Sequence, residues 1–511
     1  FTVGTGGIEA PCGSDINNDG VEDATCTFRP DGLLADTSTQ NLGAYAQDSW
    51  SVLPNLTLNA GVRWEQQTLY VADSVRGLTS PTTGEPIPDV AFKINDMFAP
   101  RLGVVYDPTK EGKAKIFGHW GRFYESIPMD INARAYGGEV FNVNILLPDQ
   151  CDPADPINTC DVDNAVVALY FGGGEEMVTP GLGGQYLDEV ILGGEYEVLA
   201  DLKVGANLVR RGLGRVIEDV STDGANTYII ANPGEIDLGE VQKIRDEADA
   251  IRGSDPDRAA FLDFQADMFE GVGSFDKPNR EYNALQLTAE RRFTKDLMVK
   301  ASYTYSQTKG NFPGLFSPET GQLDPNLTSM YDLPELMANR YGELAADRPH
   351  LLKIDGYYRY VAPDIGLFTF GTSIRAASGS PYNTLGAHPL YGNGESYILP
   401  RGTGGRSPFT TRADTHVAYG RALAGGRIVE AFADVFNVFN QQPEVRVDEI
   451  YTFDDVNPIV GGDKNDLEHL KAISPATGYS TASVVEVNPN YSNTTTRQAP
   501  LSVRFGLRFT F

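Results

Sequence analysis

The sequence contains no run of about 18 apolar residues, the length that a transmembrane helix requires. Tryptophan is scarce, with 3 residues against 24 tyrosines and 25 phenylalanines. The mean hydropathy is slightly negative, at -0.27. These features exclude a protein that crosses a membrane with helices. They do not exclude one that crosses with strands, because strands that alternate apolar and polar residues average to a polar hydropathy.

Sequence motifs for catalysis are also missing. The chain has no G-x-S-x-G nucleophile elbow, no phosphate-binding loop and no HExxH motif. We therefore expect no enzyme, no catalytic residue and no organic cofactor. The histidines are scattered, with no pair at metal-ligand spacing: His119, His350, His388, His416 and His469. The simplest interpretation of His350, in the D-R-P-H segment, is a residue at the entry of a strand.

Basic residues are outnumbered, since 69 acidic side chains face 41 basic ones and give a net charge of -28. Nearly all of the excess lies in residues 1–38, 124–183, 221–280 and 443–498. Acidic segments separated by balanced ones indicate long loops that face one solvent compartment. They also argue against nucleic acid as a partner, because like charges repel.

The end of the chain alternates without a break. Apolar side chains occupy every second position from Leu501 to Phe511, and Ser502, Arg504, Gly506, Arg508 and Thr510 occupy the others. A period of two predicts a strand with one apolar and one polar face. In a membrane barrel the apolar face meets lipid and the polar face meets a wet lumen. The terminal Phe511 resembles the ending of bacterial outer-membrane proteins, which the barrel-assembly machinery reads.

Six pairs of alternating runs precede this strand, and a short turn joins the two runs of each pair. They are 40–52 with 56–70, 98–106 with 114–124, 185–198 with 202–217, 282–293 with 297–308, 350–361 with 367–378, and 410–420 with 427–438. Longer links join one pair to the next. Short periplasmic turns and long extracellular loops are the asymmetry of a transmembrane barrel. The fold class is therefore all-β, a transmembrane antiparallel β-barrel.

The strand count predicts that this chain is part of a larger wall. Thirteen crossings that start in a long loop place Phe511 on the short-turn side. Single-chain bacterial barrels have even strand numbers, so we expect further strands upstream. The first residues, F-T-V-G-T-G-G, resemble no signal peptide, which indicates a processed or partial chain. Residues 1–38 would form an extracellular loop and 39–511 the C-terminal part of the barrel, with large loops near 124–183, 221–280, 309–347 and 443–498.

One loop is expected to contain helices. Residues 239–252 and 257–271 have helical spacing, with Pro256 at the start of the second segment and Gly271 at its end. We expect an acidic helical hairpin on the extracellular face. It either packs over the other loops or recognises a partner.

A calcium motif stands out in the first acidic segment. Oxygen ligands recur at alternate positions around a turn at Gly20, namely Asp15, Asn17, Asp19, the Val21 carbonyl and Asp23. The spacing predicts a structural Ca²⁺ site, and the alternative is a turn rich in Asp and Asn. A weaker candidate comprises Asp152, Asp155, Asp161 and Asp163.

The four cysteines form two close pairs in the acidic segments, Cys12 with Cys26 and Cys151 with Cys160. Close pairs without a CxxC motif predict two loop disulfides in an oxidising compartment. The alternative is four reduced thiols. Inward-facing arginines are a further candidate, because they could bind an anionic substrate or pair with carboxylates of the lumen: Arg63, Arg375, Arg504 and Arg508.

Several stretches resemble TonB-dependent outer-membrane receptors. They include GAYAQDSWSVLPNLTLNAGVRWE (43–65), APRLGVVYDP (99–108), GRFYE (121–125), YNALQLTAERRF (282–293), ASYTYS (301–306), DRPH (347–350) and DVFNVFN (434–440). YLDEVILGGEYEVL (186–199) and IEDVS (217–221) favour the Oar-like branch, whose members carry a carboxypeptidase-regulatory-like domain before the plug.

The resemblance implies a 22-stranded barrel, plugged by an N-terminal domain, that takes up a scarce ligand with energy delivered through TonB. Plug, TonB box and the first nine strands are not in this sequence, so an N-terminal part or a second chain or fragment would supply them. Other expected partners are outer-membrane lipid, lipopolysaccharide and the barrel-assembly machinery. The alternatives are a passive porin, a structural or surface-interaction barrel, and a soluble secreted β-rich binding protein. The acidic loops fit either a cationic or metal-chelate ligand or divalent-ion bridges to lipopolysaccharide.

Overall fold

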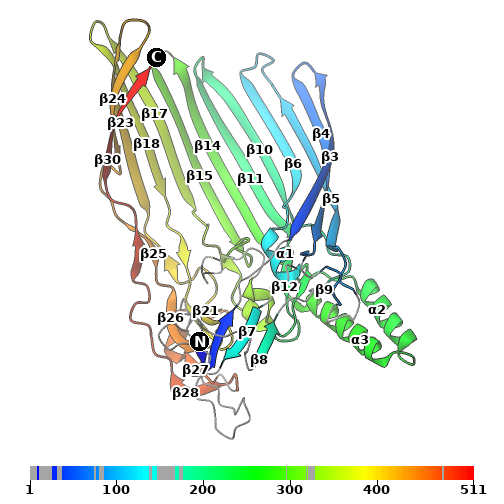
Figure 1. The fold of residues 1–511 in the computed structure, drawn as a ribbon. Helices are drawn as coiled ribbons and strands as arrows, with labels where there is room; N and C mark the ends of the chain where they lie inside the picture. Colours follow the sequence, from blue (N-terminus) through cyan, green and yellow to red (C-terminus); the bar gives the residue numbers. More distant parts are fainter. Residues whose placement is uncertain are drawn as a thin grey trace.

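The computed structural model in Figure 1 shows a tall sheet that rises from a bed of folded loops. It describes residues 8–10, 26–30, 37–73, 76–79, 86–136, 141–146, 167–171, 177–294, 296–317, 319, 321, 328–474 and 477–511. In this part of the chain, no helix is both long and apolar enough to cross a membrane.

The tall sheet is a succession of thirteen antiparallel strands, here called the strand wall, in which each strand pairs with the next one. The number confirms the sequence prediction, although β5 begins at Val90 and not at residue 98. A short strand, β16 (Gly342–Glu343), pairs with β15 beside the wall. The wall strands are β3 (Ser38–Leu53), β4 (Leu56–Tyr70), β5 (Val90–Tyr106), β6 (Ala114–Tyr124), β10 (Tyr186–Leu199), β11 (Leu202–Arg215), β14 (Arg280–Thr294), β15 (Leu297–Gly310), β17 (His350–Ala362), β18 (Gly366–Ala377), β23 (Thr410–Ala422), β24 (Ile428–Phe436) and β30 (Ser502–Thr510).

The outer face of the wall is apolar and uncovered. In the terminal strand Phe505 is 79% exposed, Leu507 82% and Phe509 53%. A soluble sandwich would bury these side chains between two sheets. Their exposure excludes that interpretation and agrees with a wall whose outer side chains meet lipid.

The wall is open at both borders. Among the described residues β3 pairs only with β4, and β30 pairs only with β24 (Figure 1). Both border strands run from the loop bed towards the short turns, so they are parallel to each other. The C-terminus lies on the short-turn side, as the sequence predicts.

Local turn chemistry explains why neighbouring wall strands are antiparallel and in register. Between β5 and β6 the Asp107 carboxylate accepts hydrogen bonds from the backbone N–H of Thr109 at 2.9 Å and of Gly112 at 2.7 Å. Lys110 and Gly112 have φ values of 61° and 75° there, and glycine adopts such values without a steric cost. The turn therefore fixes where β6 starts relative to β5.

The long connections fold together into what we call the loop bed, the described parts of residues 8–30, 71–89, 125–185, 216–279, 311–349, 378–409 and 437–501. The sequence predicts long loops here, and the structure adds short strands and apolar cores. Its elements are β1 (Ile8–Ala10), β2 (Cys26–Pro30), α1 (Met129–Tyr136), β7 (Phe141–Leu146), β8 (Val167–Phe171), β9 (Met177–Val178), β12 (Glu218–Val220), β13 (Ile229–Ala231), α2 (Leu238–Ile251), α3 (Pro256–Gly271), η3 (Val272–Ser274), η4 (Ser329–Tyr331), η5 (Pro334–Met337), β19 (Pro381–Tyr382), β20 (Leu385–His388), β21 (Gly392–Tyr397), β22 (Gly405–Arg406), β25 (Glu444–Val447), β26 (Ile450–Asp455), η6 (Asp466–His469), β27 (Lys471–Ile473), β28 (Ser480–Val484) and β29 (Thr494–Arg497).

The predicted helical hairpin is present as α2 and α3. Asp237 caps α2 by accepting from the N–H groups of Gly239 and Glu240, and Asp255 caps α3 by accepting from the N–H of Arg258. The hairpin buries one face in an apolar cluster with β12, β13 and η4. Of the two expected roles, packing over the other loops is thus confirmed.

Candidate functional site on the inner face of the strand wall

The inner face of the wall carries the polar side chains of each strand, and charged groups there form pairs. Asp434 stands opposite Arg504, and Glu430 opposite Arg508, in the register of β24 and β30. The corresponding ion-pair distances are 2.7 and 3.0 Å. Opposite charges placed across neighbouring strands stabilise a sheet.

All four inward arginines singled out in the sequence have a carboxylate partner. Arg63 lies 2.8 Å from Glu65, and Arg375 donates to both carboxylate oxygens of Asp355 at 2.8 and 2.9 Å. Arg504 and Arg508 have the partners given above. The pairing alternative is therefore confirmed for these residues. The anion-binding alternative would require each guanidinium to exchange its carboxylate for a ligand.

Two histidines on the inner face extend such pairs into groups of three. His416 Nδ1 lies 2.6 Å from Asp434 Oδ1, while Arg504 Nε donates to Asp434 Oδ2 at 2.9 Å. On the same inner face, nearer to the β3 border, His119 Nε2 lies 3.0 Å from Glu189, which also accepts a hydrogen bond from Arg211. Sequence reasoning missed both groups, because partners from three strands become visible only when the strand register is known.

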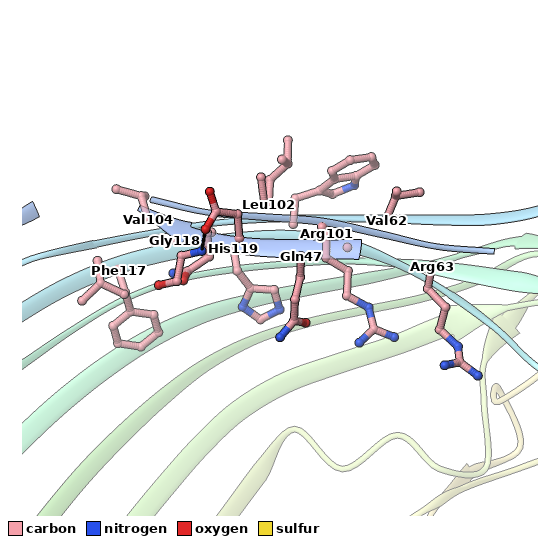
Figure 2. Close-up of a pocket in the computed structure, with 18 of the residues that line it drawn as sticks. Gln47, Val62, Arg63, Arg101, Leu102, Val104, Phe117, Gly118 and His119 are labelled. Carbon is pink, nitrogen blue, oxygen red and sulfur yellow. Dashed lines mark hydrogen bonds between the residues drawn. The ribbon is translucent and has the colours of Figure 1, made fainter. Parts of the chain in front are cut away.

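A recess on the inner face of β3–β6 has a different character. Figure 2 shows Gln47, Arg63, Arg101 and His119 pointing to one side of the strands, whereas apolar neighbours such as Leu102 point to the other. Arg101 has no ion-pair partner among the described residues. Its guanidinium lies 4.9 Å from the Phe123 ring centroid, a cation–π contact that leaves its hydrogen-bond donors available.

Lys115 repeats this arrangement in the same recess, since its ammonium lies 4.5 Å from the Phe117 ring centroid and pairs with no carboxylate in the described part of the chain. Two glycines, Gly61 and Gly121, stand opposite Arg101 on its two neighbouring strands. A Cβ at Gly61 would come within 3.0 Å of the Gln47 side chain. The recess thus contains two cations that pair with no carboxylate of the described residues, and it can accept an anionic group.

The D-R-P-H segment (347–350) connects the strand wall to the loop bed through hydrogen bonds. Asp347 is fully buried and accepts from the Thr308 N–H at 2.6 Å and from the Arg406 guanidinium at 2.7 Å. His350 begins β17, which confirms its predicted place at a strand entry, and its Nδ1 lies 2.7 Å from the Tyr303 hydroxyl.

Acidic groups are also buried under the helical hairpin. Burial raises the pKa of Glu218 well above its usual value, and its carboxylate accepts from the Thr328 N–H at 3.1 Å. Burial likewise raises the pKa of Asp332 to about 6, although the Tyr391 hydroxyl donates to it. Burial disfavours the charged form of a carboxyl group. These groups belong to the packing of the loop bed.

The remaining predicted sites have no structural description. Asp15, Asn17, Asp19, Val21 and Asp23 lie outside the described residues, as do Asp152, Asp155, Asp161 and Asp163. Cys12, Cys151 and Cys160 also lie outside them, and Cys26 begins β2 without a described side chain. Calcium binding and both disulfides therefore stay predictions. The described residues themselves contain no group of three or more His, Cys, Asp or Glu side chains that could hold a metal ion.

Phe511, the expected assembly signal, follows β30 and is 96% exposed. His388 and His469 lie in the loop bed, at β20 and η6, away from His119 and His416 on the wall.

Comparison with known proteins identifies the family. A family model described as an outer membrane beta barrel domain matches residues 31–198 and 269–361. The TonB-dependent transporter Oar from Myxococcus xanthus is 34% identical over an alignment of 507 positions, which covers 94% of this chain and 43% of that protein. The chain therefore spans less than half the length of this relative.

Solved structures with a similar arrangement include the ferric-catecholate import receptor Fiu from K12 E. coli. It is 12% identical, with a TM-score of 0.41, over 83% of this chain and 47% of that one. The ferric yersiniabactin uptake receptor FyuA from Yersinia pestis is 10% identical, with a TM-score of 0.41, over 95% of this chain and 47% of that one. From the family match, the chain belongs to the outer-membrane β-barrel family, it is similar to the TonB-dependent transporter Oar, and its location is the bacterial outer membrane.

Proposed function

We propose that this chain forms the C-terminal part of the wall of a TonB-dependent transporter that takes up a scarce ligand. The observation that carries the proposal is the open wall, whose border strands β3 and β30 run in the same direction. An antiparallel wall closes between two such borders only through an odd number of further strands. Nine would complete the 22-stranded barrel that the resemblance implies.

The inner face supports this proposal because it is suited to contact a plug and a passing ligand. Ion pairs across neighbouring strands line the wet lumen, as for Arg375–Asp355, Arg504–Asp434 and Arg508–Glu430. In the recess, Arg101 and Lys115 make cation–π contacts and no ion pair with another described residue. A plug domain and a TonB box upstream would provide the link to the energy-coupling complex.

A passive porin or a structural surface barrel is the competing function, since it needs only three or five further strands and no plug. Ion conductance separates the two. The complete gene product should give no steady current in planar lipid bilayers, because a plug closes the lumen. A steady, TonB-independent current would contradict the proposal and favour the porin.

Energy coupling requires a second test. A purified periplasmic domain of TonB should cross-link to the complete gene product through a segment upstream of residue 1. Absence of cross-linking, with a closed barrel in bilayers, would favour a structural surface barrel instead.

Assembly by the barrel-assembly machinery is part of the proposal. Phe511 is 96% exposed, and its ring centroid lies 5.9 Å from that of Phe509. Phe511→Ala should therefore lower the amount of assembled barrel without lowering the stability of barrels that do assemble. Heat-modifiable migration on gels measures the first and a urea titration the second.

We also propose a structural Ca²⁺ site whose ligands are Asp15, Asn17, Asp19, the Val21 carbonyl and Asp23. A Cys12–Cys26 disulfide would hold this loop closed, and a second disulfide would join Cys151 and Cys160. Chelation with EDTA should increase protease cleavage near residue 20. Peptide mapping without reductant should show both linkages. Unchanged cleavage would contradict the calcium site, and four free thiols would contradict the disulfides.

A further inference from the structure

The lipid-facing side of the wall contains a groove near the loop bed. It crosses β10, β11, β14 and β15 and has a volume of about 440 Å³. Its apolar side chains are exposed, with Leu192 at 54%, Leu208 at 57% and Leu285 at 37%. Since this face of the wall meets lipid, an acyl chain can lie along these leucines and fill the groove.

Polar side chains border one end of the groove, where they stand opposite one another on neighbouring strands. Arg210 stands opposite Asn283, and Asn283 stands opposite Gln307. One row nearer to the short turns, Leu208 stands opposite Leu285, and Leu285 opposite Tyr305. The two rows mark the line at which the apolar band ends and the headgroup region begins on the extracellular side.

Arg210 is available to a ligand. Its side chain is 65% exposed, and its distance to the Glu281 carboxylate is 3.7 Å, too long for a hydrogen bond. Arg122, on the same face, differs, since it donates to both oxygens of Asp188 at 2.9 and 3.0 Å and lies over the Tyr186 ring. The side-chain amides of Asn283 and Gln307 make no hydrogen bond within the described part of the chain, so they offer further donors beside Arg210.

We propose that this groove binds one phosphorylated glycolipid of the outer leaflet, with a phosphate on Arg210 and an acyl chain along Leu208 and Leu285. A guanidinium binds phosphate through paired, charge-assisted hydrogen bonds. Basic side chains at the membrane surface attract anionic headgroups. The loop end of the wall is the extracellular end, so the lipid comes from the leaflet that contains lipopolysaccharide. The proposal depends on the outer-membrane location and not on what the protein transports.

The same face offers a matched control at its other end. Arg291 also points outward on β14, and from Asn283 to Arg291 the strand rises about 26 Å at about 3.3 Å per residue. This length agrees with the roughly 25 Å apolar band of such barrels. Arg291 pairs with Asp201 at 2.9 Å near the short turns, where the inner leaflet lies.

Native mass spectrometry of the complete gene product in detergent, with added lipid A, tests the proposal. The unaltered protein should retain one lipid A molecule. Arg210→Gln should weaken that binding by about tenfold or more, because hydrogen bonds to a charged group are lost. Arg291→Gln should leave it unchanged. Because both side chains are exposed, both variants should keep heat-modifiable migration, which reports the folded barrel.

Lipid A without its phosphates should bind no better to the unaltered protein than to Arg210→Gln. Equal retention of lipid A by the unaltered protein and Arg210→Gln would overturn the proposal. Loss of binding on addition of EDTA would assign it to a divalent bridge instead of direct contact with Arg210. Displacement of lipid A by an equal concentration of phosphatidylglycerol would overturn the glycolipid specificity.

Discussion

The strand wall and the loop bed are built from one chain but obey different rules of burial. In the wall, large apolar side chains such as Phe505 and Leu507 are exposed on one face, and ion pairs such as Arg508–Glu430 lie partly exposed on the other. In the loop bed, apolar side chains such as Ile217 are fully buried, and the ion pair Arg401–Glu319 has exposed fractions of 1% and 2%.

The difference shows where each region gains its stability. A wall that is one strand thick has no interior, so its stability comes from backbone hydrogen bonds between strands and from contact with lipid. The loop bed stands in water, and it must bury apolar surface as a soluble domain does. The same substitution should therefore have different consequences in the two regions.

The largest contrast is expected for an ion pair. Arg401→Met leaves the buried Glu319 carboxylate without its partner, which typically costs about 3–5 kcal/mol. Hydrogen exchange should show the loop bed around residues 395–402 opening more often, while the wall strands stay protected. Arg508→Met is the matched control, because Arg508 is 64% exposed and such pairs contribute about 0–1 kcal/mol. Equal effects of the two variants would contradict the comparison.

A similar contrast is expected for apolar side chains. Ile217 belongs to a buried cluster of the loop bed, so Ile217→Ala should lower the free energy of local unfolding by about 2–5 kcal/mol. Leu507→Ala on the outer face leaves no cavity, because lipid fills the space. Urea titrations followed by protease resistance of the loop bed and by heat-modifiable migration of the wall would measure the two effects. A wall variant that loses as much as the loop-bed variant would mean that the outer face is packed against protein.

A pH dependence is expected in the loop bed. Burial and the nearby Glu319 raise the pKa of Glu449 to about 7, against an ordinary value of 4.5. Between these two values the folded state holds a proton that the unfolded state has lost, so stability is highest below pH 4.5 and falls as pH rises to about 7. Hydrogen-exchange protection factors, which correct for the intrinsic rise of the exchange rate with pH, should fall near residues 383–385 and 449–451 over this interval.

Glu449→Gln is the control for this prediction. The amide keeps an acceptor for the Asn383 N–H, which the Glu449 carboxylate binds at 2.7 Å, and it does not titrate. The fall in the protection factors should disappear in this variant. An unchanged pH profile in Glu449→Gln would assign the dependence to another group.

The two regions also differ in how far the sequence predicts them. The period of two that runs from Leu501 to Phe511 recurs in the other wall strands, apart from the first half of β5, and it predicts strand number, faces and the position of the C-terminus correctly. The loop bed has no such period. Strands as short as β13 and β20 pair with strands that are distant in sequence, β9 and β26, so no local pattern marks them.

The site shows the same limit. Residue parity predicts that Arg375 and Arg504 face inward, but not which carboxylate each one binds, because that depends on the register between strands. Arg101 shares its face and parity with Arg63, but Glu65 lies two positions after Arg63 on the same face, whereas Gly103 takes that position after Arg101. The structure adds that Gly61 and Gly121, and no carboxylate, stand opposite Arg101 on the neighbouring strands.

The smallest effect on stability is expected for an ion pair on the inner face of the wall. Arg375 and Asp355 form two hydrogen bonds, but their exposed fractions are 40% and 42%. Water screens such a pair, so a double-mutant cycle with Arg375→Met and Asp355→Asn should give a coupling energy of about 0.2–1 kcal/mol. Urea titration of the assembled barrel measures each corner of the cycle. Coupling of several kcal/mol would mean that this part of the lumen is dry, which would require a plug packed against β17 and β18 in the complete protein.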